Sequence, residues 1–373
     1  SPTLKWKIGC PNLANDTGCT SGFDQLGQTW SGAVSLKASG YDSGSKPMLM
    51  FGGGYDSCED ADTNSTSVCS SPKGNRIYVV DADAGTRLAT LNTDRGVVGD
   101  VVVAKGSDGL AKYAYAADLG GNVYRITIGT AAPASWTITK VASVGCSTVT
   151  TCAPRRKFMF APDVVEENGI YTVLLGSGDR EKPTSSSTNA AAVSNYFFMI
   201  KDKPSDASWL SSESGNCGGT GVICLNSLLA ITTNTNPSSA DLATKKGWYL
   251  GLASSEQVVT TAITVLGTVT FSTSRPSSVA VDSCSANLGT ARVYNIAYTN
   301  AATKNGTANR YETLPAGGLS PSPVAGKVTL DDGKTVIFVI GGSAASALQT
   351  KQPPTFSSGG AQPSKRVYWN VQK

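Results

Sequence analysis

The chain has 373 residues, of which 40% are hydrophobic and 16% charged, with a formal net charge of +4 and no histidine. The missing histidine removes the commonest general base and metal ligand, which excludes Ser–His–Asp triads and haem or zinc sites with histidine ligands within this chain. The longest basic run, Arg155-Arg156-Lys157, is too short for a footprint on nucleic acid, and no stretch approaches the roughly 18 apolar residues of a membrane helix. We therefore expect no nucleic-acid partner and no transmembrane segment, while carboxylate, lysine or tyrosine chemistry stays open.

Short runs rich in β-branched and aromatic residues, bounded by Gly, Asn or Asp, follow one another along the chain. No long window places apolar residues at i, i+3, i+4 and i+7, so helix is the minority state. The sequence therefore predicts an all-β fold. The expected strands are, in chain order, 47–51, 76–80, 97–103, 113–116, 123–128, 171–175, 196–200, 258–271, 292–298 and 336–340.

The expected strands recur in a weak repeat. Segments 101–117, 161–176 and 322–342 are followed by Tyr-rich segments at 122–126, 195–200 and 365–369 respectively. Each repeat is typical of one four-stranded antiparallel unit of about 45 to 60 residues, the period of propeller blades. Hairpin turns are expected at Asn168-Gly169 and at Asp331-Asp332-Gly333-Lys334, because these residues tolerate positive φ.

We therefore predict one β-propeller domain over residues 1–373, modified or partial, with about five to seven blades. Polar segments rich in Pro or Ser interrupt it at 184–192, 232–241 and 350–364. These segments are expected to be long, mobile loop inserts between blades or at their edges.

Eight of the nine cysteines lie close to a neighbour in sequence, with no C-x-x-C spacing of a zinc site. Local disulfides that close loops are therefore predicted, which implies an oxidising compartment. The ninth, Cys284, either pairs with another segment or chain or is a small buried hydrophobe. The four predicted pairs are Cys10 with Cys19, Cys58 with Cys69, Cys146 with Cys152, and Cys217 with Cys224.

Two motifs are compatible with enzymes built on propellers. Residues 79–85, Val-Val-Asp-Ala-Asp-Ala-Gly, are similar to the strand-to-turn signature of quinoprotein blades, and we favour a structural role for Asp81 over a cation site. A quinone-dependent dehydrogenase would also need a cofactor floor and an axial metal, which the sequence does not indicate. Residues 24–30 loosely resemble the Asp-box turn of sialidases, so a glycosidase remains the other enzyme alternative.

The densest acidic run contains Asp56, Glu59, Asp60, Asp62 and Asn64. Calcium uses such oxygen ligands, but the run lacks the alternating D-x-D-x-D-G register. We expect a solvated acidic loop. Gly52-Gly53-Gly54 lacks the Lys-Ser/Thr that would follow in a phosphate cradle. We therefore predict no catalytic, cofactor-binding or metal-ligating residue and no cofactor for this chain.

Several longer motifs occur in the order known from one family. They are Tyr113-Ala-Tyr-Ala-Ala-Asp118-Leu-Gly-Gly-Asn122-Val-Tyr-Arg125, Gly176-Ser-Gly-Asp179-Arg180-Glu181-Lys-Pro183, Gly247-Trp248-Tyr249-Leu250 and Val269-Thr-Phe-Ser-Thr273, with Cys58-Glu-Asp and Asn75-Arg-Ile-Tyr-Val-Val-Asp81 before them. Over nearly its whole length the chain resembles the C-terminal propeller of the PilC/PilY family of type IV pilus factors.

The resemblance implies a non-enzymatic, pilus tip-associated assembly factor and adhesin that supports pilus extension and surface attachment. The implied partners are minor pilins and a host or abiotic surface receptor. The implied location is extracellular, at the pilus tip or outer cell surface, after export through the periplasm. Leu4-Lys-Trp6-Lys-Ile-Gly9 resembles a strand from the middle of the family propeller, so we expect this chain to be the C-terminal part of a longer protein.

PilY-type propellers often carry a calcium loop, D-x-[DN]-x-D-G-x-x-D, just before the Tyr-Ala-Tyr-Ala strand. The resemblance places its ligand positions here on Ala104, Gly106, Asp108 and Lys112. One carboxylate beside an ammonium is too little negative charge for tight calcium binding. We therefore predict that the 104–112 loop folds as an ordinary turn centred on Asp108-Gly109 without metal, although calcium could bind elsewhere in the full-length protein.

Overall fold

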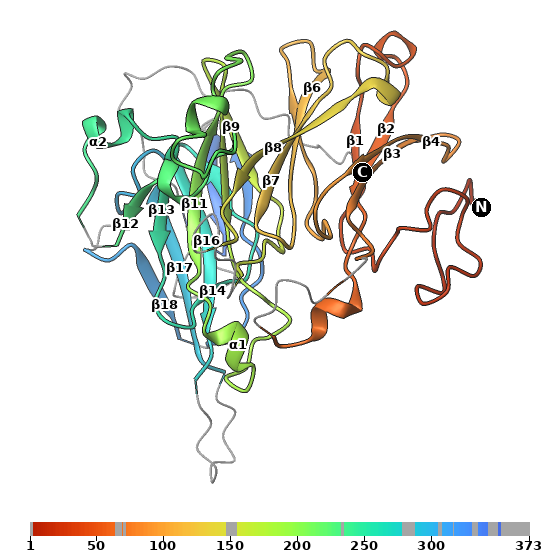
Figure 1. Cartoon of the computed structure of the whole chain (residues 1–373). Coiled ribbons are helices and arrows are strands. Elements are labelled where there is room, and N and C mark those ends of the chain that lie inside the picture. Colours follow the sequence, from red (N-terminus) through yellow and green to blue (C-terminus); the bar gives the residue numbers. More distant parts are fainter. Residues whose placement is uncertain are drawn as a thin grey trace.

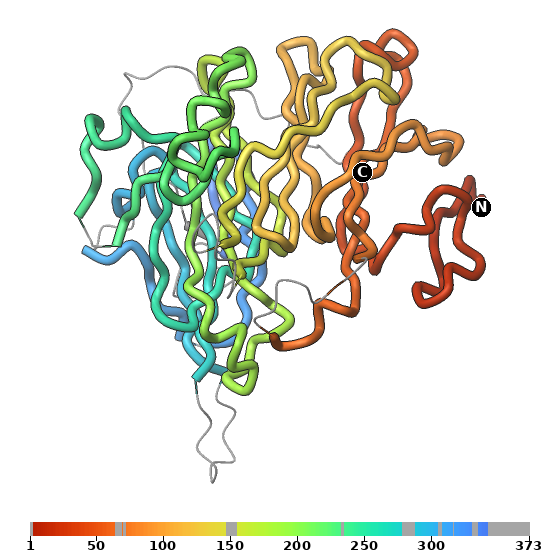
Figure 2. Tube along the Cα trace, in the orientation of Figure 1, coloured from red at the N-terminus to blue at the C-terminus, as the bar shows by residue number. Residues whose placement is uncertain are grey.

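The computed structural model describes residues 3–63, 69, 72–146, 155–232, 235–277, 288–304, 308–315, 317–329, 335–341 and 350–351. Within these ranges the chain is almost entirely β, with 21 strands in five sheets. Figure 1 shows the sheets following one another in chain order, from the red and orange N-terminal sheet through yellow and green to blue. The tube in Figure 2 shows tight hairpins within the sheets together with longer loops, such as the connection from β11 to β12.

The first two sheets are four-stranded antiparallel meanders. The first has the order β1-β2-β3-β4 and consists of β1 (Val34–Leu36), β2 (Met48–Gly52), β3 (Arg76–Asp81) and β4 (Arg87–Asn92). The second has the order β5-β6-β7-β8 and consists of β5 (Val102–Lys105), β6 (Ala111–Ala117), β7 (Asn122–Thr127) and β8 (Thr137–Ser143).

The third sheet has the order β12-β13-β11-β10-β9, and its β12–β13 pair is parallel. Its strands are β9 (Asp163–Glu167), β10 (Ile170–Gly176), β11 (Tyr196–Asp202), β12 (Leu229–Ile231) and β13 (Gly247–Gly251). The fourth has the order β14-β16-β17-β18, with β15 also paired to β16. Its strands are β14 (Gln257–Val258), β15 (Ile263–Val265), β16 (Thr268–Arg275), β17 (Thr290–Ala297) and β18 (Tyr311–Leu314).

The fifth sheet has the order β19-β20-β21, formed by β19 (Val324–Thr329), β20 (Thr335–Ile340) and β21 (Thr350–Lys351). The helical elements are short. They are α1 (Thr188–Ala191), α2 (Ser239–Ala243), η1 (Asp42–Gly44), η2 (Ser57–Asp60), η3 (Pro133–Ser135), η4 (Ser211–Glu213) and η5 (Leu225–Ser227). No helix in the described part of the chain has the length and apolar character needed to cross a membrane.

The inner strands of the first four sheets are largely buried on both faces, because each of these sheets packs face to face on the next. Successive side chains of a strand point to opposite faces. In β6, Ala114 and Ala116 join the core shared with the first sheet, whereas Tyr115 and Ala117 join the core shared with the third. This arrangement explains why the inner strands read as continuous apolar runs, and it is the packing of propeller blades.

The contact between the third and fourth sheets is aromatic. Phe271 of β16 is fully buried and stacks on Phe197 of β11, with ring centroids 3.9 Å apart and planes inclined by 5°. Its other face stacks on Tyr294 of β17 at 4.7 Å. Trp248 of β13 is fully buried in the same core, so large rings fill the space between these two blades.

Two buried carboxylates bond to arginine and tyrosine inside the blades. Asp202, at the end of β11, is fully buried and accepts hydrogen bonds from Arg125 (2.8 Å) and Tyr115 (2.9 Å) of the second sheet. Glu256 is likewise fully buried and accepts hydrogen bonds from Arg292 (2.6 Å) and Tyr294 (2.9 Å). The Asp202 group fixes the second blade against the third, since its partners lie on β6 and β7.

Most predicted inner strands are confirmed, with boundaries shifted by one or two residues. The expected strand 258–271 is wrong as one element. The chain reverses at Leu266 (φ 47°) and Gly267 (φ 78°), and this turn separates β15 from β16. Residues 257–258 form a further separate strand, β14. The first part of 97–103 is also not strand, since Val97 bonds to the backbone of Gly54 and Gly74 in a connection.

The predicted turns and inserts have mixed outcomes. Asn168 (φ 53°) and Gly169 (φ 76°) form the β9–β10 hairpin turn as expected. The insert 184–192 contains α1, and 232–241 contains the start of α2, so neither is a plain loop in its described residues. Residues 331–334, 352–364 and the predicted strand 365–369 lie outside the described residues.

Candidate functional site

Charged side chains from separate segments of the chain meet close to α1. Figure 1 shows α1 at the lower end of the molecule. Glu59 on η2 is central to this group, and its side chain is only 3% exposed. Asp56 caps η2 by accepting a hydrogen bond from the backbone N–H of Cys58 (2.9 Å), and its other oxygen accepts the backbone N–H of Lys73 (2.7 Å). This cap and the Cys58–Cys69 disulfide constrain the short turn that carries Glu59.

Four cationic side chains pair with two carboxylates in what we call the charged cluster: Glu59, Arg95, Arg155, Lys157, Asp179 and Lys182. Glu59 lies 3.7 Å from Arg95, 3.5 Å from Arg155 and 3.1 Å from Lys157, measured between charged atoms. Asp179 lies 3.1 Å from Lys157 and 3.2 Å from Lys182. The Lys182 ammonium also donates to the backbone carbonyl of Glu59 at 3.0 Å, so the cluster joins a loop of the first sheet to a loop of the third.

Burial and neighbouring charges shift the pKa values of the cluster's bases. Burial lowers the pKa of the Arg155 guanidinium, and the nearby Arg95 charge adds to this effect, against the attraction of Glu59. Burial also disfavours the charged form of Lys157, but Asp179 and Glu59 outweigh it, so the pKa of the Lys157 ammonium lies above its ordinary value. Lys157 is therefore a fixed cation at neutral pH and unsuited to act as a nucleophile or general base.

A cavity of about 40 Å³ lies beside the charged cluster. Its lining includes Arg155, Lys157, Asp179 and Lys182, together with Asp62 and Asn189. The Asp62 carboxylate accepts hydrogen bonds from the backbone N–H groups of Asn189 (3.0 Å) and Ala190 (2.9 Å). These bonds hold α1 against the loop of the first sheet, so the walls of the cavity come from two blades.

The acidic run 56–64 is not a uniformly solvated loop, which corrects the expectation from sequence. Glu59 is buried by its ion pairs, and Asp56 and Asp62 each accept backbone N–H groups. Asp60 is exposed and accepts the hydroxyl of Tyr55 at 2.9 Å. Asn64 lies outside the described residues. The carboxylates of the described part of this run thus have separate partners.

The 104–112 loop forms a tight hairpin turn between β5 and β6. Asp108 accepts the backbone N–H of Leu110 at 3.0 Å, and its other oxygen pairs with the Lys112 ammonium at 3.0 Å. Gly109 has φ 76°, and its N–H donates to the carbonyl of Gly106. The turn is centred on Asp108-Gly109, and its one carboxylate is bonded to groups of the protein.

We expect this hairpin not to bind calcium tightly, because calcium needs about six to eight oxygen ligands and Lys112 holds positive charge at the site. Titration calorimetry on the purified chain should show no micromolar calcium binding that depends on Asp108. Such binding, lost in Asp108→Ala and retained in Asp56→Ala, would contradict this prediction. Binding lost only on changing Asp56 or Asp60 would locate a different site.

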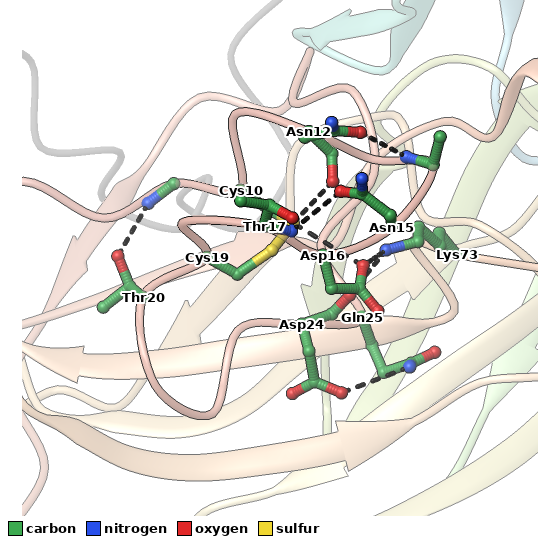
Figure 3. Close-up of a disulfide and its surroundings, with 12 residues drawn as sticks. Cys10, Asn12, Asn15, Asp16, Thr17, Cys19, Thr20, Asp24, Gln25 and Lys73 are labelled. Carbon is green, nitrogen blue, oxygen red and sulfur yellow. Dashed lines mark hydrogen bonds and ion pairs between the residues drawn. A yellow bond between two sulfur atoms is a disulfide. The ribbon is translucent and has the colours of Figure 1, made fainter.

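Three of the four predicted cysteine pairs are joined in the structure: Cys10 with Cys19, Cys58 with Cys69, and Cys217 with Cys224. Cys146 is also disulfide-bonded, while its predicted partner Cys152 and the ninth cysteine, Cys284, lie outside the described residues. Figure 3 shows the first bridge, with Asp16 beside it paired to Lys73. Within the described chain, the only trio of potential metal ligands in mutual reach is Cys10, Asp16 and Cys19, and the disulfide removes its two thiolates.

We expect nonreducing peptide mapping of native protein to recover all four local bridges. Each should stabilise the fold by about 2 to 4 kcal/mol if loop entropy dominates. Free thiols at Cys10 or Cys58, or pairing of these residues across blades, would show the prediction wrong.

The charged cluster was not anticipated from the sequence, although two signals point to parts of it. The basic run 155–157 supplies Arg155 and Lys157, and the family-like motif 176–183 supplies Asp179 and Lys182. Asp81, by contrast, has the predicted structural role. Its carboxylate accepts the N–H groups of Asp83 and Ala84, and Gly85 follows with φ 69°.

Sequential sheets that pack face to face define the chain as a β-propeller-like protein. Its fold is similar to the crystal structure of the Pseudomonas aeruginosa PilY1 C-terminal domain, with 16% identity, coverage of 88% of this chain and 74% of that chain, and a TM-score of 0.57. The predicted PilY-like propeller fold is thereby confirmed.

More distant similarities are found to two other solved structures. Kuenenia stuttgartiensis hydrazine synthase has 9% identity, a TM-score of 0.34 and coverage of 87% of this chain and 77% of that chain. BamB from Moraxella catarrhalis has 11% identity, a TM-score of 0.28 and coverage of 80% and 68%. No protein-family model matches the chain, and no curated protein matches it either.

Proposed function

We propose that this chain is a non-enzymatic assembly factor and adhesin associated with the tip of type IV pili. The observation that carries the proposal is the PilY1-like fold over 88% of the chain. The same chain bears motifs that resemble the PilC/PilY family in the family's order, so fold and sequence support the proposal by separate routes. We further propose that residues 1–373 form one propeller domain from the C-terminal part of a longer protein.

In this function the chain supports pilus extension and surface attachment. Minor pilins are the proposed partners in assembly, and a host or abiotic surface receptor is the proposed partner in attachment. The disulfide-bonded loops are compatible with export through the periplasm to the pilus tip or outer cell surface, since disulfides persist in oxidising compartments.

A secreted propeller enzyme is the second candidate, and one observation favours it. Arginines and carboxylates converge in the charged cluster, as a glycosidase acting on acidic sugars would require. Tyr55, which lies beside Asp60 of the η2 turn that carries Glu59, is a poor nucleophile, however. Tyr55 is 1% exposed and bonded to Asp60, and burial, with Glu181 and Asp60, raises the pKa of its hydroxyl. We therefore rank the binding function first.

Genetic removal tests the proposal directly. Deleting this region of the gene in the source strain should remove most surface pili, measured by immunoblotting of sheared pilin and by electron microscopy. Complementation with the unaltered gene should restore them, and so should additional deletion of the retraction motor. Unchanged pili and unchanged attachment in the deletion strain would contradict the proposal.

Turnover assays separate the two candidate functions. Purified protein should remain at background with glycoside and quinone-dependent dehydrogenase substrates, because Tyr55 and Lys157 are held in unreactive states. A rate above background that disappears in Glu59→Gln or Tyr55→Phe, with the fold retained, would favour the enzyme. The matched control is Tyr41→Phe, because Tyr41 is not part of the charged cluster and its hydroxyl donates to Asp81.

A further inference from the structure

The chain has four methionines, and one of them is partly exposed whereas the other three are buried. Met48 and Met50 are 0% exposed, and Met199 is 2% exposed. Met159 is the partly exposed one. Because an oxidant must reach the thioether sulfur, burial protects the other three for as long as the protein stays folded. Met159 is therefore the methionine that the folded chain offers to an oxidant.

The Met159 side chain lies where loops of three blades meet. It packs against Tyr55, which follows β2, against Val98 in the connection from β4 to β5, and against Leu119 in the turn between β6 and β7. Its sulfur accepts the backbone N–H of Arg180, which follows β10, at an N···S distance of 3.2 Å. Arg180 is exposed, so this hydrogen bond lies at the surface of the molecule. One thioether thus joins a loop of the third blade to the first two blades.

We propose that Met159 is a site of reversible oxidation to methionine sulfoxide, and that this oxidation releases the loop that carries Arg180. The oxidant is a peroxide. A lone pair of the sulfur attacks one peroxide oxygen, an S–O bond forms as the O–O bond breaks, and hydrogen peroxide leaves as water. Sulfur is oxidised and the peroxide is reduced, so no further reactant is needed. The N–H of Arg180 occupies one lone pair, and the second lone pair remains for the attack. This reaction is independent of the proposed pilus function.

The sulfoxide cannot keep the present hydrogen bond to Arg180. An N–H···O bond needs about 2.9 Å between nitrogen and oxygen alone, so no oxygen fits between a nitrogen and a sulfur that are 3.2 Å apart unless the loop moves. If the oxygen points elsewhere, the sulfur carries partial positive charge and no longer accepts the N–H. Bonds on both sides of Arg180 depend on this loop. The backbone N–H of Asp179 donates to the side chain of Gln257, and the Lys182 ammonium donates to the carbonyl of Glu59.

Site-resolved mass spectrometry of the folded chain, treated with dilute hydrogen peroxide, is the direct test. Met159 should be oxidised at least about tenfold faster than Met48, Met50 and Met199, which serve as internal references. In protein unfolded with guanidinium chloride, all four should react at similar rates, which would show that the selectivity comes from the fold. Similar rates at all four methionines in the folded chain would overturn the proposal, and this comparison requires no variant.

Hydrogen exchange measures the effect of oxidation on the loop. Amide exchange in residues 178–183 should become faster after oxidation, and methionine sulfoxide reductase should restore the original rate. Met159→Leu keeps a similar apolar volume without an oxidisable sulfur, so its exchange should not respond to peroxide. The matched control, Met199→Leu, should respond as the unaltered chain does. An equal response in Met159→Leu, or unchanged exchange of residues 178–183 in chain oxidised at Met159, would also overturn the proposal.

Discussion

Replacing Asp202 with alanine should lower the free energy of unfolding by about 3 to 5 kcal/mol, the usual cost of removing one partner from a buried ion pair. Asp202 is fully buried and bonds to Arg125 and Tyr115 of the neighbouring blade. Its removal leaves the guanidinium of Arg125, only 13% exposed, without its carboxylate. Chemical denaturation followed by tryptophan fluorescence measures the loss as a lower midpoint.

The adjacent residue supplies the matched control. Lys203 is 40% exposed and lies 3.8 Å from Asp206, so Lys203→Ala breaks a surface pair and should leave the midpoint nearly unchanged. Asp202→Asn keeps the shape of the side chain and one acceptor oxygen. Its denaturation midpoint should therefore lie between those of Asp202→Ala and Lys203→Ala. If Asp202→Ala lowers the midpoint no more than Lys203→Ala does, the ion pair does not join the second and third blades in the way we describe.

Phe271→Ala should cost about 3 to 5 kcal/mol, because it leaves a cavity in the aromatic core between the third and fourth blades. The ring of Phe271 is stacked between Phe197 and Tyr294, so the substitution removes contacts on both faces. Phe271→Leu fills much of the space and should cost less. The same denaturation measurement provides the values.

A large apolar residue on the surface controls for the loss of apolar area. Leu288 is 59% exposed, so Leu288→Ala should change stability little. A small effect of Phe271→Ala, comparable to that of Leu288→Ala, would contradict the packing of these two blades. A lower transition slope as well as a lower midpoint would instead indicate that the fourth blade unfolds separately.

The inner strands were predictable because the propeller buries them on both faces. The segment 196–200 is therefore apolar throughout, and 76–80 is apolar after Arg76, so both stand out in the sequence. The outer strands carry polar side chains on an exposed face, and β4 and β8 were missed for that reason. The reversal at Leu266-Gly267 was missed because a leucine with positive φ is not a usual turn signal.

The charged cluster was harder to predict because its residues come together only through tertiary structure. Glu59, Arg155 and Lys182 are separated by many residues and meet only when the loops of different blades fold over one end of the molecule. In the sequence, Glu59 belongs to an acidic run, which normally indicates solvent exposure. Its burial depends on the capped turn, the Cys58–Cys69 bridge and cations from distant segments.

The location and neighbours of the protein on intact cells test the central claim most directly. We would label an epitope-tagged chain with immunogold on sheared and cell-attached pili, and crosslink it in living cells before identifying its neighbours by mass spectrometry. The account predicts gold at the ends of pilus fibres and crosslinks to minor pilins, both absent from a strain unable to assemble pili. Gold distributed away from pili, together with crosslinks unchanged when the minor pilins are deleted, would contradict a function at the pilus tip.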